Sequence, residues 1–131
     1  FKGVTLDLSG LTSIDKDVTQ ELAKFKGYEL LLLGLTSIDK EVAKELAKYK
    51  MNLYLGGLTS IDKSVAQELA KVKGVALYLI GLTSIDKDVA QELAKFGGRK
   101  LWLSGLTSID KNILKILKSN SKIELPKKYR D

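Results

Sequence analysis

Three acidic residues near the start of this 131-residue chain are spaced like ligands of a calcium ion. Asp15 and Asp17 form the Asp-x-Asp pair that opens an EF-hand calcium loop, and Glu21 follows them. That loop needs a glycine at its sixth position, and this stretch has none there. The segment also has the periodicity of a helix, so we interpret Asp15 as a helix N-cap and predict no metal site.

A second stretch, GLTSIDKS at residues 57–64, ends in Lys-Ser like a phosphate-binding loop. It lacks the glycine that immediately precedes the lysine in such loops, and most of its letters recur elsewhere in the chain. We therefore expect neither a nucleotide site nor any other bound cofactor.

Both signals lie in a repeated unit, because the phrase GLTSID occurs five times, beginning at Gly10, Gly34, Gly57, Gly81 and Gly105. Spacings of 24, 23, 24 and 24 residues are typical of a solenoid. A catalytic group needs a singular environment, whereas a residue repeated in five stacked units has five nearly equivalent ones. The chain also has no Cys and no His, which excludes thiol nucleophiles and imidazole bases. We predict that the protein is not an enzyme.

Each repeat unit combines two hydrophobic periodicities, as its first copy shows. Leu6 and Leu8 alternate with polar residues, which predicts a short strand with one buried face. Apolar residues then follow in one stripe of an amphipathic helix, at Ile14, Val18, Leu22 and Phe25. Each unit is therefore expected to be a strand, a turn and a helix.

The residues of the turn have expected structural roles. Gly10 should permit backbone angles that a side chain would forbid, and Leu11 should point into the core. Thr12 and Ser13 are candidates to hydrogen-bond the backbone of the turn. Gly27 has the character of the residue that follows a helix end.

The pattern Leu6-x-Leu8-x-x-Leu11-x-x-Ile14, repeated every 23 to 24 residues, resembles the leucine-rich repeat. With the helix that follows, it looks most similar to the cysteine-containing subclass of that family. Leucine stands where that subclass has cysteine, at Leu11, Leu35, Leu58, Leu82 and Leu106. The resemblance implies an α/β solenoid, coiled right-handed, with a parallel β-sheet on its concave face and α-helices on its convex face. Members of the family are mostly protein-binding modules whose sheet lines that concave surface.

We expect a single leucine-rich-repeat domain over residues 1–131. Its repeats are predicted at about 3–26, 27–50, 51–73, 74–97 and 98–120, with a C-terminal cap at 121–131. Ile123-Glu124-Leu125 restores the strand alternation, and Pro126 with the nearby lysines would discourage a further strand from pairing there. The N-terminal edge has no such protection, so we expect the natural chain to continue upstream in a longer array.

Most of the net charge of +6 lies near the C-terminus. Residues 111–131 contain seven Lys or Arg and two acidic residues, which leaves about one net charge for the first 110 residues. Nucleic acid needs a basic face that follows its phosphates, and a nearly neutral body does not supply one. The apolar runs, such as residues 30–33, are far too short to cross a bilayer. We therefore expect neither nucleic acid nor a membrane as a partner.

Function is expected where the copies differ, on the strand face that points away from the core. The third residue before each repeat glycine is, in order, Asp7, Leu31, Tyr54, Tyr78 and Trp102. Neighbouring parallel strands lie about 4.8 Å apart, so the three aromatic residues would form a row about 10 Å long. Exposed apolar patches of this kind usually mark an interface, and Tyr and Trp are typical anchors.

The predicted partner is a protein or peptide, bound through Leu31, Leu33, Tyr54, Tyr78, Ile80 and Trp102. Two other interpretations of the aromatic row are open, because aromatic residues stack across strands for stability alone and a stacked row could also hold a sugar chain. A different class of function is structural: a spacer or self-associating segment that forms a homo-oligomer through the concave face or the N-terminal edge.

Overall fold

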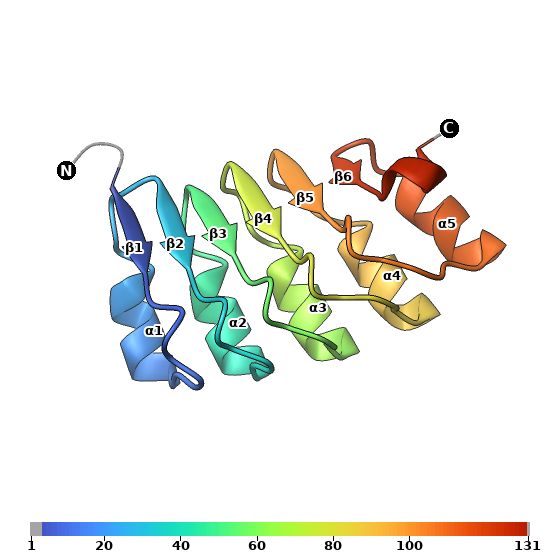
Figure 1. Cartoon of the computed structure of the whole chain (residues 1–131). Helices are drawn as coiled ribbons and strands as arrows, with labels where there is room; N and C mark the ends of the chain where they lie inside the picture. Colours follow the sequence, from blue (N-terminus) through green and yellow to red (C-terminus); the bar gives the residue numbers. More distant parts are fainter. Residues whose placement is uncertain (1–3, 131) are drawn as a thin grey trace.

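A computed structural model describes residues 4–130 of the chain. Residue 3, the first of the predicted first repeat, and residue 131, the last of the predicted cap, lie outside the described residues. Strand–helix units stack side by side along the array (Figure 1). The strands are β1 (Thr5–Asp7), β2 (Glu29–Leu31), β3 (Asn52–Tyr54), β4 (Ala76–Tyr78), β5 (Lys100–Trp102) and β6 (Ile123–Glu124). The helices are α1 (Lys16–Leu22), α2 (Lys40–Leu46), α3 (Lys63–Leu69), α4 (Lys87–Leu93) and α5 (Lys111–Lys118), and a 3-10 helix, η1 (Lys127–Tyr129), follows β6.

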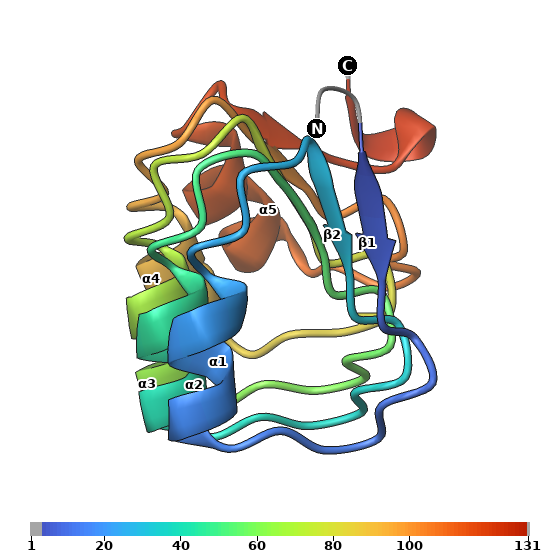
Figure 2. The same cartoon turned by 90° about the vertical axis from the view of Figure 1, so that its left-hand side faces the viewer.

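Over residues 4–130, six strands form one parallel sheet in the order in which they occur in the chain. Their register follows the repeat, since Leu6 pairs with Leu30 and Leu30 pairs with Leu53. The helices cover one face of the sheet, and a view from the β1 end shows them stacked in a layer of their own (Figure 2). The predicted α/β class with a parallel sheet and repeated units is confirmed.

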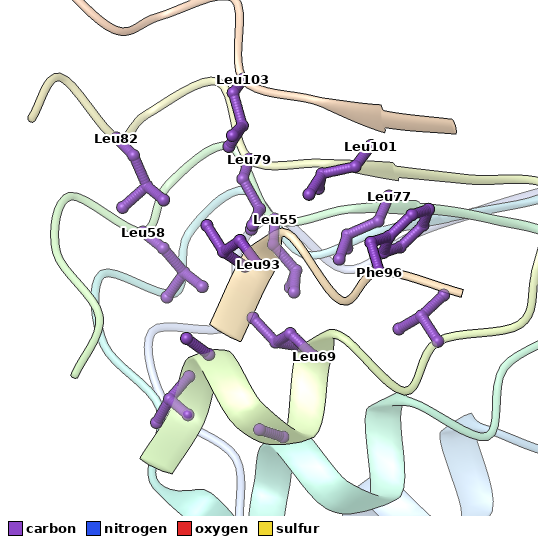
Figure 3. Packing of buried hydrophobic residues seen from close by; sticks show 14 of the residues in the cluster. Leu55, Leu58, Leu69, Leu77, Leu79, Leu82, Leu93, Phe96, Leu101 and Leu103 are labelled. Carbon is purple, nitrogen blue, oxygen red and sulfur yellow. The ribbon is translucent and has the colours of Figure 1, made fainter. Parts of the chain in front are cut away.

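Columns of leucine fill the space between the sheet and the helices. The middle residue of each strand from β2 to β5 is fully buried: Leu30, Leu53, Leu77 and Leu101. Leucines of neighbouring units lie side by side and point toward Leu69 and Leu93 of the helices (Figure 3). Four of the five residues that replace cysteine in the resemblance are buried too, with Leu35, Leu58 and Leu82 at 0% exposure and Leu106 at 2%, whereas Leu11 in the first unit is not. Burying one leucine side chain contributes about 1.5–3 kcal/mol, so these columns hold the units together.

An aspartate caps the N-terminus of every helix from α1 to α5. Oδ1 of Asp15 accepts a hydrogen bond of 2.8 Å from the backbone N–H of Val18. The same bond recurs at 2.8–2.9 Å in the later units, at Asp39, Asp62, Asp86 and Asp110. The N-cap interpretation of Asp15 is confirmed, and such a cap contributes about 1 kcal/mol to stability.

The repeated glycine has a different purpose from the one expected. None of the five repeat glycines has a backbone φ in the left-handed region, so the backbone conformation does not require glycine at these positions. A Cβ at Gly57 would instead overlap the carbonyl oxygen of Leu33, and one at Gly81 would overlap that of Gly56. At Gly10 a Cβ would have no neighbour within 4 Å, because no earlier unit lies beside it among the described residues. The glycine is needed for the close approach of one unit to the previous one.

The expectation that turn hydroxyls bond the turn backbone holds in the last unit, where the Thr107 hydroxyl donates to the Thr83 carbonyl at 3.3 Å. Within residues 4–130, Thr12 and Ser13 make no side-chain hydrogen bond, and the backbone N–H of Leu11 donates to the carbonyl of Leu8 at 2.9 Å instead.

The expectation about Gly27 is wrong. Helix α1 ends at Leu22 with Ala23 as a right-handed cap, so Gly27 does not follow the helix end. A Cβ at Gly27 would overlap the carbonyl oxygen of Val4, so this glycine also permits close packing.

The two ends of the array differ in exposure. At the β1 end, Leu11 is 36% exposed and Val18 is 45% exposed, although their counterparts in the inner units are at most 2% exposed. At the other end, Ile123 and Leu125 are 8% and 4% exposed. Arg130 Nε donates to the Leu125 carbonyl at 2.8 Å, which ties the segment after β6 to the last strand.

The glycine contacts predict unequal effects of the same substitution at two repeat positions. Gly57→Ala is expected to lower the free energy of unfolding by about 1–3 kcal/mol, because the added methyl overlaps the Leu33 carbonyl and forces two units apart. Gly10→Ala is the matched control, and its stability is expected to remain within about 1 kcal/mol of wild type or to increase. Urea denaturation measures both, and equal losses would contradict a packing role for the inner glycines.

Candidate functional site

The candidate site lies on the face of the sheet opposite the helices, here called the open sheet face. Side chains alternate along each strand, so in β3 Leu53 is buried against the helices while Asn52 and Tyr54 point to the other side and are half-buried. Leu31, Tyr54, Tyr78 and Trp102 occupy the same strand position and pair in register across β2 to β5. Leu33 and Ile80 lie two residues after Leu31 and Tyr78, respectively, and are 43% and 48% exposed.

Tyr54, Tyr78 and Trp102 form a stacked aromatic row, as predicted. The ring centroids of Tyr54 and Tyr78 are 4.2 Å apart with the planes inclined by 2°. Those of Tyr78 and Trp102 are 5.8 Å apart with the planes inclined by 4°. Each such pair contributes about 0.5–1.5 kcal/mol beyond its buried area, so the row also stabilises the fold. Because the rings cover one another's faces, they turn their edges toward the solvent.

An apolar ridge, formed by Leu33, Gly56 and Ile80, lies on the same face beside the aromatic row. A Cβ at Gly56 would lie 3.1 Å from Cγ1 of Ile80 and 3.4 Å from Cδ2 of Leu33. The absence of a side chain at Gly56 therefore allows the two large aliphatic side chains to converge above it. The six predicted residues and Gly56 together form the apolar patch. The contribution of Gly56 was missed from the sequence, although a glycine between two aliphatic counterparts was a signal for it.

Polar residues lie at the β1 end of the apolar patch. The hydroxyl of Thr5 donates to Glu29 Oε1 at 2.7 Å, and the hydroxyl of Tyr54 donates to Glu29 Oε2 at 3.0 Å. Burial raises the pKa of the Tyr54 phenol above its ordinary value, with further contributions from Tyr78 and Glu29, so this hydroxyl remains a donor. Hydrogen bonds from the Ser9 side chain and backbone lower the pKa of Asp7, which favours its ionised form.

A salt bridge lies at the opposite end of the apolar patch. Lys100 in β5 pairs with Glu124 in β6, and the two residues occupy neighbouring strands on the open sheet face. Their charges compensate each other at this end. The sequence did not indicate this pairing, because it depends on the register of the sixth strand.

A concave region that the sequence did not indicate lies away from the open sheet face, between the C-terminal ends of α1 and α2. It has a volume of about 600 Å³ and is lined mainly by Lys24, Lys26, Lys48, Lys50, Phe25 and Met51. Two of these lysines form ion pairs, since Lys24 lies 3.1 Å from Glu21 and Lys48 lies 2.9 Å from Glu45. A Lys-x-Lys sequence after each of the first three helices was the available signal. None of the lining residues belongs to the open sheet face.

No family model matches this chain, and no curated protein or solved structure matches it significantly. Among residues 4–130, no helix is long and apolar enough to cross a membrane. The same residues contain no group of three or more His, Cys, Asp or Glu side chains that could hold a metal ion.

Stacking predicts that the environment of the single tryptophan depends on Tyr78. Tyr78→Ala should shift the Trp102 fluorescence emission to longer wavelength and weaken the near-ultraviolet circular dichroism, because the indole loses the ring that covers its face. Tyr28→Ala is the control, since Tyr28 is 48% exposed and lies outside the aromatic row. An identical emission spectrum for the two variants would contradict the observed stacking.

Proposed function

We propose that this protein is a leucine-rich-repeat recognition module, a right-handed solenoid that binds a protein or peptide segment through the concave surface formed by the open sheet face. It performs no chemistry on its partner. The apolar patch is the observation that carries this proposal, because it combines a stacked aromatic row with two aliphatic side chains that are 43% and 48% exposed. Apolar surface of this kind is stabilised when a partner removes it from water.

The arrangement of the repeat supports the family assignment. Each unit places a leucine at the position of the family's cysteine, and these leucines are buried in the inner units. Sequential parallel strands with helices on one face are the arrangement that the resemblance implies. Repeat proteins of this kind bind partners over extended surfaces, which the open sheet face provides.

The geometry of the aromatic row favours a peptide over a sugar chain. A sugar ring packs on the free face of an aromatic ring, but the inner faces of Tyr54, Tyr78 and Trp102 cover one another. The exposed ring edges carry positive partial charge, which suits peptide carbonyl oxygens and the faces of aromatic side chains. Leu33 and Ile80 add aliphatic surface that a peptide's apolar side chains can cover.

The proposal predicts that removing the aromatic row abolishes binding while the fold remains. Peptides selected on the wild-type protein from a random 12-residue display library serve as probes. The combined variant Tyr54→Ser, Tyr78→Ser and Trp102→Ser should raise their Kd at least about 30-fold, since anchor residues of this kind contribute about 2 kcal/mol or more. Far-ultraviolet circular dichroism should remain nearly unchanged, because the leucine columns are on the other side of the sheet.

The matched control replaces three exposed residues on the helix side, through Lys63→Ser, Gln67→Ser and Lys87→Ser. Binding to this control variant should remain within about twofold of wild type. Equal loss of binding in both variants, an unfolded aromatic-row variant, or a library that yields no binder would each contradict the proposal.

A second candidate function is self-association through the β1 end of the array. The observation that favours it is the exposure of Leu11 and Val18, whose counterparts in the inner units are buried by a neighbouring unit. A second copy could cover these side chains and pair with the free edge of β1.

Sedimentation equilibrium over a wide concentration range tests this second candidate. The average mass should rise above 14.4 kDa as concentration increases, and the double variant Leu11→Ser and Val18→Lys should remain monomeric. The far-ultraviolet circular dichroism of the variant provides the control for folding. A wild-type protein that is monomeric at every concentration would overturn self-association and leave the peptide-binding proposal intact.

A further inference from the structure

The charges around the apolar patch are distributed unequally. Asp7 and Glu29 lie on the open sheet face at its β1 and β2 end, one strand apart and on the same side of the sheet. Lys100 and Glu124 lie at the β5 and β6 end, where they neutralise each other. The side chains of the strands thus give the β1 and β2 end, here called the anionic end, two negative charges, whereas those of Lys100 and Glu124 cancel.

The two carboxylates at the anionic end have hydrogen-bond donors but no cationic partner. Asp7 accepts from the backbone N–H of Ser9 at 3.0 Å, and Glu29 accepts from the hydroxyls of Thr5 and Tyr54. Among residues 4–130, neither carboxylate lies in an ion pair. These hydrogen bonds hold the carboxylates in place without cancelling their charge.

Within the described part of the chain, the other acidic residues without an ion pair lie at the N-terminal ends of the helices and not on the sheet. Glutamates on the first four helices each pair with the lysine three residues later: Glu21 with Lys24, Glu45 with Lys48, Glu68 with Lys71 and Glu92 with Lys95. The chain as a whole has a net charge of +6. Among residues 4–130, Asp7 and Glu29 are thus the acidic residues of the strands that have no ion pair, and they lie on the same face as the exposed apolar side chains.

The dimensions of the patch limit the ligand. Its rows run across the strands from β2 to β5, a distance of three strand spacings or about 14 Å. An extended peptide advances about 3.3 Å per residue, so four to five residues cover the patch when the peptide crosses the strands. A residue next to this segment at one end would lie over β1, beside Asp7 and Glu29.

We propose that the partner is a peptide segment with an apolar core of about four to five residues and a lysine or arginine at the end that lies over β1 and β2. This inference rests on the proposed peptide-binding function of the open sheet face. The apolar core is buried on the aromatic row and the apolar ridge, and the cation pairs with the two free carboxylates. Such charge complementarity fixes the orientation of the peptide and raises its association rate.

The test uses synthetic fluorescein-labelled peptides with one common core, the apolar segment of a peptide selected on the wild-type protein. Two lysines are appended at the amino or the carboxyl end, and two glutamates replace them in the counterpart peptides. In fluorescence anisotropy at low salt, one lysine peptide should bind about 5- to 10-fold more tightly than its glutamate counterpart. The difference should shrink below about twofold in 1 M NaCl, which screens exposed charges beyond about 3 Å.

The variants Asp7→Asn and Glu29→Gln, combined, remove both charges; the amide oxygen at position 7 can still accept from Ser9, and the single amide oxygen at position 29 can accept one of the two hydroxyls. In this double variant the preference for lysine should disappear. The matched control, Lys100→Gln with Glu124→Gln, removes the compensated ion pair at the β5 and β6 end and should retain the preference.

Each outcome separates the inference from the function on which it rests. Equal binding of lysine and glutamate peptides to wild type, or a preference that persists in the double variant, would overturn the inference while peptide binding stands. Absence of binding by every peptide would overturn the proposed function itself. A peptide affinity that weakens as protein concentration rises would identify a second copy as the occupant of the patch and also overturn the inference.

Discussion

The close approach of successive turns is the constraint on which the rest of the structure depends. Each inner repeat glycine lies so near a carbonyl oxygen of the previous unit that no side chain could fit there. The strands of neighbouring units are consequently held in register, and residues at the same repeat position become direct neighbours. Leucine columns then form on the helix side and an aromatic row on the other side. The repeated glycine thereby allows residues at the same position of successive repeats to lie side by side in rows.

Much of this arrangement could be predicted because it depends on local periodicity. Alternating leucines indicated the strands, the apolar stripe indicated the helices, and Asp15 was correctly interpreted as a helix cap. The aromatic row was predictable as well, since in-register strands bring Tyr54 and Tyr78 together whatever the details of the turn. The prediction that this row binds a partner remains a prediction.

The details that the sequence did not indicate involve contacts between units. Backbone angles were the expected reason for the repeated glycine, but a carbonyl oxygen of another unit is the cause, and no pattern within one repeat contains that atom. The bond from Tyr54 to Glu29 also joins two units and depends on side-chain rotamers. The same holds for Leu33 and Ile80, which converge over Gly56 only once three turns are stacked.

Stability and recognition are not competing explanations of the aromatic row. Stacking fixes the three rings in the free protein, so little side-chain freedom remains to be lost when a partner covers their edges. If the proposed function holds, removal of one ring affects both properties by different mechanisms: stability through the lost ring contact, and affinity through the lost apolar surface. The carboxylates of Asp7 and Glu29 act differently again, since an exposed charge is screened by salt and buried apolar area is not. The salt dependence of the proposed peptide binding would thus separate the contribution of the two carboxylates from that of the apolar patch.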